Sequence, residues 1–157
     1  MPQDYEIIIS DTSCLILLDK INAWNLLKAF NKPVFITPII KNEFGKKLPP
    51  WIAIKSPKNL DIQKVLEVDL DKGEASALAL AMESPSVLLL IDELKGRKVA
   101  ENLNLHFSGT LGLIIKAKQL KIISSIRPFL EAIQKTNFRI KESLITQLLQ
   151  EAGESKE

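Results

Sequence analysis

The chain has 157 residues, a length at which one domain can bury roughly two thirds of its unfolded surface without disulfides. Its hydrophobic fraction of 46% and its charged fraction of 25% exclude a disordered or fibrous chain. Because 21 basic and 19 acidic residues leave a formal net charge of only +2, any nucleic acid must be contacted by local basic side chains. We expect a single domain over residues 1–152, followed by a polar tail over residues 153–157.

The cysteine content and the apolar runs predict where the protein works. Cys14 is the only cysteine, which excludes an internal disulfide and favours a reducing compartment. The first ten residues lack the basic start and the long apolar run of a signal peptide. No apolar run is long enough to cross a bilayer. These features predict a soluble, cytoplasmic protein.

Strand-like and helix-like segments alternate along the chain. Short apolar runs that end at polar residues predict buried strands at residues 7–9, 34–36 and 87–91, with an edge strand at 52–54 beside prolines and a further strand around His106 and Phe107. Helical spacing predicts helices at residues 25–30, 73–82, 95–103 and 111–119, and two closing helices between 124 and 150. The alternation indicates βαβ units and therefore a three-layer α/β domain.

Acidic side chains occupy the positions where a parallel sheet binds ligands. Asp11 and Asp92 each directly follow a predicted strand, and ligands bind beyond the carboxyl ends of such strands. Glu43 lies on a short helix expected from Pro38, and Glu74 lies at the amino end of the helix that begins near residue 71. Carboxylates that cluster repel one another unless a cation neutralises them. An all-oxygen set suits Mg²⁺ or Mn²⁺ better than Zn²⁺.

Each of these residues also has an ordinary structural explanation. Most acidic side chains are solvated, and Asp11 with Thr12 and Ser13 resembles an N-cap cluster. The helix dipole alone favours a carboxylate at the position of Glu74. The hydroxyls of Thr12, Ser13 and Thr110 could orient a carboxylate, water or phosphate, or could cap helices. Cys14, inside an apolar run, is expected to be a small core residue.

Basic side chains flank the predicted acidic crevice and could contact an RNA backbone. They are Lys41, Lys46, Lys47, Lys95, Arg97 and Lys98. We single out Arg97 and expect the lysines to form ordinary solvated surface.

The order and spacing of these motifs resemble the PIN domain superfamily. The resemblance lies in residues 9–13, in a glutamate about thirty residues later, in the stretch 71–81, and in residues 89–93 with Gly96, Arg97 and Ala100. Residues 108–113 with Ala117 and Lys118 are similar to a PIN-like branch of uncharacterised prokaryotic proteins related to VapC-type toxins.

The resemblance implies a three-layer α/β/α PIN-like (Rossmann-like) fold with a central, mostly parallel sheet. It also implies a metal-dependent endoribonuclease in which Asp11, Glu43, Glu74 and Asp92 hold Mg²⁺ or Mn²⁺ and hydrolyse RNA phosphodiester bonds. Glu74 departs from the aspartate that VapC-type proteins often have, and Glu93 can replace or join Asp92. A type II toxin role implies an antitoxin protein as partner, and a homodimer.

Two other functions remain open at this point. A PIN-like module could bind RNA or a protein without cutting. The chain could instead be a phosphotransfer protein in which Asp11 or Asp92 accepts the phosphoryl group. Haloacid-type phosphatases, however, need a second aspartate where this chain has Ser13.

Overall fold

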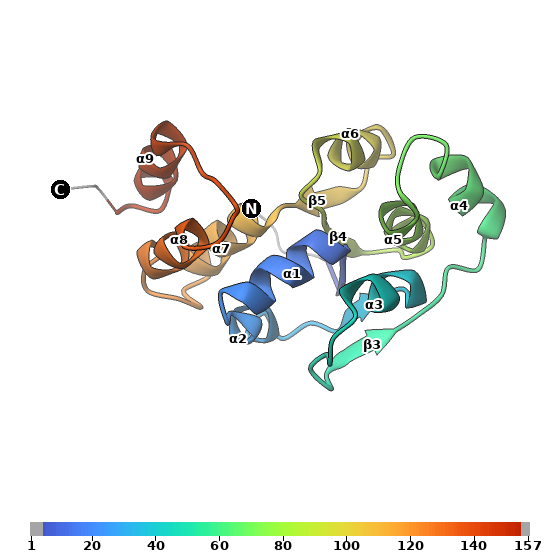
Figure 1. The fold of residues 1–157 in the computed structure, drawn as a ribbon, viewed down its shortest axis with the longest axis horizontal. Coiled ribbons are helices and arrows are strands. Elements are labelled where there is room, and N and C mark those ends of the chain that lie inside the picture. Colours follow the sequence, from blue (N-terminus) through green and yellow to red (C-terminus); the bar gives the residue numbers. More distant parts are fainter. Residues whose placement is uncertain (1–4, 155–157) are drawn as a thin grey trace. The chain divides into compact units, whose positions relative to one another are not determined.

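The computed structural model describes residues 5–154, and its strands all belong to one sheet. The strands are β1 (Ile7–Ser10), β2 (Val34–Ile36), β3 (Ile52–Ile54), β4 (Val87–Leu90) and β5 (His106–Ser108). The sheet order is β3-β2-β1-β4-β5, and every pairing is parallel (Figure 1). Helices flank this sheet, so the predicted three-layer α/β/α fold is confirmed.

The helices follow the expected alternation closely. They are α1 (Thr12–Lys20), α2 (Trp24–Lys28), α3 (Pro38–Phe44), α4 (Leu60–Leu66), α5 (Lys72–Met82), α6 (Leu94–Asn102), α7 (Thr110–Gln119), α8 (Arg127–Gln134) and α9 (Glu142–Glu151). Helix α4 was not predicted. Its apolar side chains Leu60 and Val65 are 58% and 70% exposed, so apolar character does not indicate which face of this helix is buried.

The centre of the sheet forms the core of the part that carries the candidate site. Strands β1 and β4 pair over their full length, from Ile7 with Val87 to Ser10 with Leu90, and β4 is buried at every position. Helix α5 packs against both strands and against α3 and α4. Residues 73–81 of α5 are all buried, and the small alanine side chains allow this close packing. The amino end of α5 is thereby held firmly at the carboxyl edge of the sheet.

The chain divides into two compact units. One contains the sheet with α3 to α6, from Lys32 to Gly109, together with the segment that ends at Ile16. The other contains Leu17–Asn31 and the chain from Thr110 onward, and therefore α2, α7, α8 and α9. All four acids of the predicted metal site belong to the first unit.

The end of the chain differs at one residue from the expected free polar tail. Glu154 accepts hydrogen bonds from Lys118 Nζ (2.7 Å), Ser125 Oγ (2.7 Å) and the backbone N–H of Ile126 (2.8 Å). Burial alone raises the pKa of Glu154, but these hydrogen bonds, together with the Lys118 charge, lower it to about 2. Glu154 therefore belongs to the folded second unit, while the remainder of the predicted tail, residues 155–157, lies outside the described residues.

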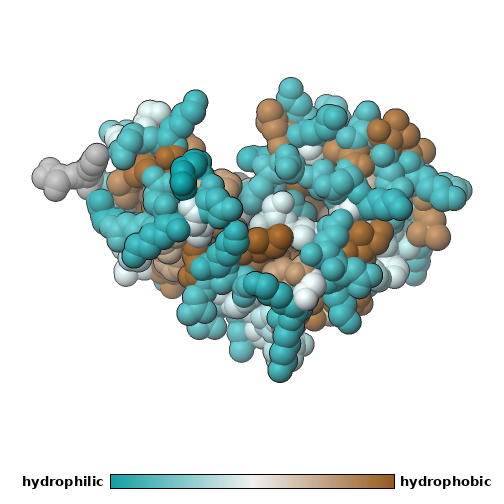
Figure 2. All heavy atoms as spheres, in the orientation of Figure 1, coloured by the Kyte–Doolittle hydropathy of each residue, from teal (hydrophilic) through white to brown (hydrophobic). Residues whose placement is uncertain are grey.

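The surface in Figure 2 is mostly hydrophilic, with brown apolar patches between the charged side chains. Among residues 5–154, the most exposed large apolar side chain is Val68, just beyond α4, at 81%. Within residues 5–154, no helix is long and apolar enough to cross a membrane.

Candidate active site

Asp11 and Asp92 lie together at the carboxyl edge of the sheet. Each follows one of the two central strands, and the last residues of these strands, Ser10 and Leu90, are paired. The backbone N–H of Asp11 donates to Leu90 O (2.9 Å), and the N–H of Asp92 approaches Asp11 Oδ2 (3.4 Å). The structure thus brings together the two strand-end aspartates.

The Asp11 carboxylate is almost completely buried, with 1% of the residue exposed. Its Oδ1 accepts a hydrogen bond from the backbone N–H of Cys14 (3.0 Å). The pKa of Asp11 is raised to about 6, mainly by burial and in addition by the charge of Asp92. The hydrogen bonds that Asp11 accepts lower its pKa and offset part of this rise. An ionised Asp11 therefore carries negative charge that the fold does not fully compensate.

Cys14 contributes more than the core packing expected from the sequence. Its side chain is fully buried, and Sγ donates to Asp92 Oδ2 (3.2 Å). One residue of α1 therefore contacts both aspartates, Asp11 through its backbone and Asp92 through its thiol. Sequence reasoning missed this link because the apolar run around Cys14 does not show where the thiol points.

Glu74 lies in the first turn of α5 and is 9% exposed. Burial, followed by the charges of Asp71, Glu93, Asp11 and Glu43, raises the pKa of Glu74 to about 7. Four other acids are thus close enough to act on this carboxyl. Glu74 is therefore a residue whose protonation depends on several acids of the site.

Asp71, which sequence analysis did not select, is the N-cap of α5. Its Oδ1 accepts a hydrogen bond from the backbone N–H of Glu74 (2.8 Å). Asp71 therefore supplies the side-chain cap of α5, and Glu74 is the third helical residue after it, which is the glutamate position of a capping box. An aspartate directly before a predicted helix is a typical N-cap, and this pattern in the sequence predicts the capping role of Asp71.

Glu43 reaches the site from α3. This helix begins at Pro38 after the N-cap Thr37 and ends at Gly45, which adopts the left-handed conformation (φ 69°). Glu43 Oε1 accepts a hydrogen bond from Thr12 Oγ1 (2.5 Å), and its carboxylate packs against Gly73 in α5. Thr12 therefore orients one of the predicted ligands.

Arg97 lies beside Asp92 on the other side of the site. Its guanidinium carbon is 5.5 Å from the centre of the Phe107 ring, which is a cation–π geometry. Both the Asp92 carboxylate and the Arg97 guanidinium approach Gly109. A cation held on an aromatic ring at this place can meet the phosphate of a bound substrate.

The remaining predicted residues occupy more varied positions. Glu93 is the exposed N-cap of α6, makes no side-chain capping bond, and acts on Glu74 through its charge. Ser13 is exposed on α1, and Thr110 is buried at the start of α7, in the second unit. The flanking lysines Lys41, Lys46, Lys47, Lys95 and Lys98 are exposed.

The acidic site fits a divalent cation in its chemistry, although its ligand sphere is not preassembled. Among residues 5–154, no group of three or more His, Cys, Asp or Glu side chains is arranged so that it could hold a metal ion. The donors are nevertheless all carboxylates, which suit a hard cation, and two of them have raised pKa values that a cation would lower. Binding would require these carboxylates to converge on one ion, and their oxygens have enough lone pairs to do so while they keep their hydrogen bonds.

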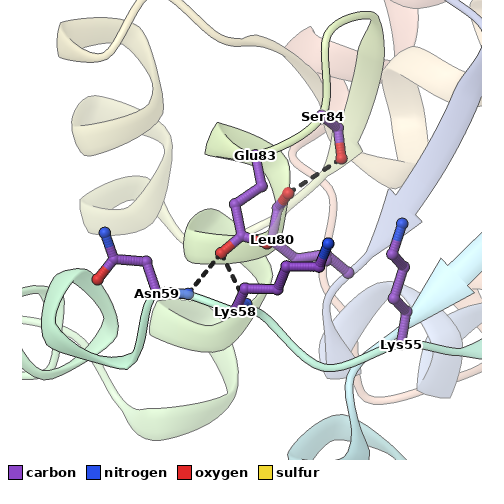
Figure 3. A pocket seen from close by; sticks show the side chains of 6 residues that line it. All are labelled: Lys55, Lys58, Asn59, Leu80, Glu83 and Ser84. Atoms are coloured by element: carbon purple, nitrogen blue, oxygen red, sulfur yellow. Dashed lines mark hydrogen bonds between the residues drawn. The ribbon is translucent and has the colours of Figure 1, made fainter.

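In the same unit, the carboxylate of Glu83 is an example of a charge that neighbouring donors and cations stabilise. A hollow of about 360 Å³ is lined by Lys55, Lys58, Asn59, Leu80, Glu83 and Ser84 (Figure 3). Glu83 accepts hydrogen bonds from the backbone N–H groups of Lys58 and Asn59, both at 2.7 Å. Desolvation opposes the shift, but these bonds and the two lysine charges lower the pKa of Glu83. At the acidic site, by contrast, burial and neighbouring acids raise the pKa values of Asp11 and Glu74.

Comparison with known protein families identifies one match that spans nearly the whole chain. A family model described as a PIN domain matches residues 7–154. No curated protein sequence matches the chain.

Proposed function

This chain belongs to the PIN-domain family, and from that membership we propose that it is a metal-dependent endoribonuclease that hydrolyses RNA phosphodiester bonds. PIN domains are generally nucleases and typically use divalent metals. The observation that carries the proposal is the acidic cluster at the carboxyl edge of the sheet, where burial and neighbouring acids raise the pKa of Asp11 to about 6 and that of Glu74 to about 7. Such uncompensated negative charge favours a bound cation.

In the proposed enzyme, Asp11, Glu43, Glu74 and Asp92 hold Mg²⁺ or Mn²⁺. When bound, such an ion stabilises negative charge on the phosphate and acidifies water. The protein supplies a buried anchor in Asp11, whose carboxylate accepts backbone hydrogen bonds. Thr12 orients Glu43, and Cys14 orients Asp92. These contacts limit the movement of the carboxylates, as outer-shell hydrogen bonds do at metal sites.

Substrate binding is proposed to use the basic and polar groups around the acids. Arg97, held against Phe107, contacts a phosphate of the RNA. Glu93, whose charge acts on Glu74, is proposed to replace or join Asp92 as a ligand, and the exposed Ser13 hydroxyl is proposed to orient water or phosphate.

Purified protein tests the proposal with RNA in Mn²⁺, Mg²⁺ or EDTA. We expect cleavage only with metal, and a loss of about 100-fold in Asp11→Asn and Asp92→Asn, which corresponds to roughly 3 kcal/mol of transition-state stabilisation. Asp61→Asn, on the exposed face of α4, is the matched control and should retain full activity. Absence of metal-dependent cleavage by the wild type, with several RNAs, would refute the nuclease assignment.

A binding module without catalysis is the alternative function. It is favoured by the hydrogen bonds that the Asp11 and Glu43 carboxylates already accept, and by the lack of a preassembled ligand group within residues 5–154. In that case the protein binds RNA or a protein equally well in EDTA and in Mn²⁺. Cleavage assays together with this binding measurement therefore separate the two functions.

The family resemblance also motivates a biological role. We propose a cytoplasmic toxin of a type II pair, which is neutralised by an antitoxin protein and forms a homodimer. Induced expression should then stop growth, and Asp11→Asn should abolish this effect while leaving the dimer mass in light scattering unchanged. Equal toxicity of the variant would separate growth arrest from the acidic site.

A further inference from the structure

Two glycines border the acidic site where no glycine is required by the backbone. We propose that Gly73 and Gly109 are positioning residues, each kept without a side chain so that one carboxylate, Glu43 or Asp92, occupies the space of its missing Cβ. The inference deepens the proposed nuclease function and rests on it for its catalytic consequence. The placement of the carboxylates can be tested without any catalysis.

Backbone conformation does not explain these two glycines. In the part of the chain that the structure describes, the glycines with positive φ are Gly45 and Gly153, so Gly73 and Gly109 have conformations open to any residue. Gly73 lies in the first turn of α5, where alanine is the better helix former. The sequence thus has a poorer helix former at position 73, and the space that a missing side chain leaves is the remaining reason for a glycine there.

At Gly73, the missing side chain makes room for Glu43. A Cβ would collide with Glu43 Oε1 and would lie 2.9 Å from Cδ and 3.0 Å from Oε2. The same Oε1 is held by the Thr12 hydroxyl, so the carboxylate cannot move aside without losing that hydrogen bond. Since the colliding group is the end of a flexible side chain, alanine would displace Glu43 and leave the helix intact.

At Gly109, the missing side chain makes room for Asp92. A Cβ would lie 2.6 Å from Asp92 Oδ1 and 3.5 Å from Arg97 Nη1. The other oxygen, Oδ2, accepts the hydrogen bond from Cys14. Alanine would therefore push Asp92 from the position that the thiol maintains, whereas its contact with the guanidinium would be ordinary.

Gly96 provides a matched control in the same unit. A Cβ there would lie 2.5 Å from Ile91 Cδ1, an apolar core atom, but 3.7 Å from Glu74 Cδ, which is ordinary contact. Gly96→Ala should therefore lower stability by crowding the core, without displacing an acid. It separates the cost of a tight fit from the loss of a positioned carboxylate.

A double-mutant cycle in EDTA tests the placement. Urea midpoints are compared for wild type, Gly73→Ala, Glu43→Ala and the double variant. We expect Gly73→Ala to raise the midpoint once Glu43 is truncated, because only the gain in helix propensity then remains, and to raise it less or lower it in the wild type. The pair Gly109→Ala and Asp92→Ala should couple with the same sign. Equal shifts in both backgrounds would overturn the proposal, whether or not the protein cleaves RNA.

The catalytic consequence is tested by rescue. Gly73→Ala should lower kcat about 10- to 100-fold, the effect expected for a group that orients a ligand, with a normal circular dichroism spectrum. Glu43→Asp shortens the side chain and should recover part of this loss in the Gly73→Ala background, while Gly96→Ala should keep its kcat. If the cycles couple but kcat does not fall, the carboxylates are positioned as proposed and the catalytic role fails. If the wild type is inactive, the proposed function fails and the cycles alone decide the placement.

Discussion

Neutralising Asp11 should change the pH dependence of stability in the metal-free protein. The native pKa of about 6 lies above the ordinary value of 3.8, so the folded state retains a proton that the unfolded state has lost. The stability that this group contributes is therefore fully present below pH 3.8 and is lost as the pH rises through about 6. At 1.36 kcal/mol per pKa unit, the loss amounts to roughly 3 kcal/mol.

Asp11→Asn removes the charge but keeps the shape of the side chain. The amide oxygen can still accept the hydrogen bond from Cys14, but its NH₂ group would face the backbone N–H of Asp92, at a cost of about 1 kcal/mol. We therefore expect the variant to be about 0.5 kcal/mol less stable than wild type at pH 4, where part of the Asp11 contribution is already lost, and about 2 kcal/mol more stable at pH 8.

Urea unfolding at pH 4, 6 and 8 in EDTA measures this difference, with the fluorescence of Trp24 and Trp51 as the signal. The exposed Asp61→Asn variant is the control for replacing an acidic side chain. A difference for Asp11→Asn that is constant from pH 4 to pH 8 would refute the reasoning, because Asp11 would then titrate alike in the folded and unfolded chains.

Three further outcomes are expected. Saturating Mn²⁺ should raise the Tm of the wild type, because a ligand at 100 times its Kd stabilises the folded state by about 2.7 kcal/mol. The Asp92→Asn variant should show a clearly smaller rise in a thermal-shift assay. An equal rise in both proteins would place the ion elsewhere. Arg97→Lys keeps the charge but loses the planar contact with Phe107, so RNA affinity should fall severalfold, and Arg97→Ala should also reduce the salt slope of binding by about 1. Glu154→Gln should lower stability at pH 7 by about 2 kcal/mol. Because the native pKa of about 2 lies below the ordinary value of 4.5, the difference measured by urea titration should shrink as the pH falls through this range. A constant deficit in stability would mean that the charge of Glu154 is not involved.

Much of the fold could be predicted because its signals are local. The apolar runs that became β1, β2 and β4 are continuous since both faces of these strands are buried. Pro38 and Gly45 mark the two ends of α3 in the sequence as in the structure. Helix α4 was missed because exposed Leu60 and Val65 break the relation between apolar character and burial.

The sequence by itself determined the fold class and the approach of Asp11 and Asp92, because paired parallel strands end at one edge and the residues after them must lie near each other. Only the tertiary structure decided how Cys14, Thr12 and the two glycines contact the acids. Cys14 and Asp92 are 78 positions apart, and Thr12 and Glu43 are 31 apart. Such contacts depend on the packing of elements distant in the chain, for which local spacing carries no signal. The same packing sets the burial that raises the pKa of Asp11 and Glu74, and so gives the acidic site its chemistry.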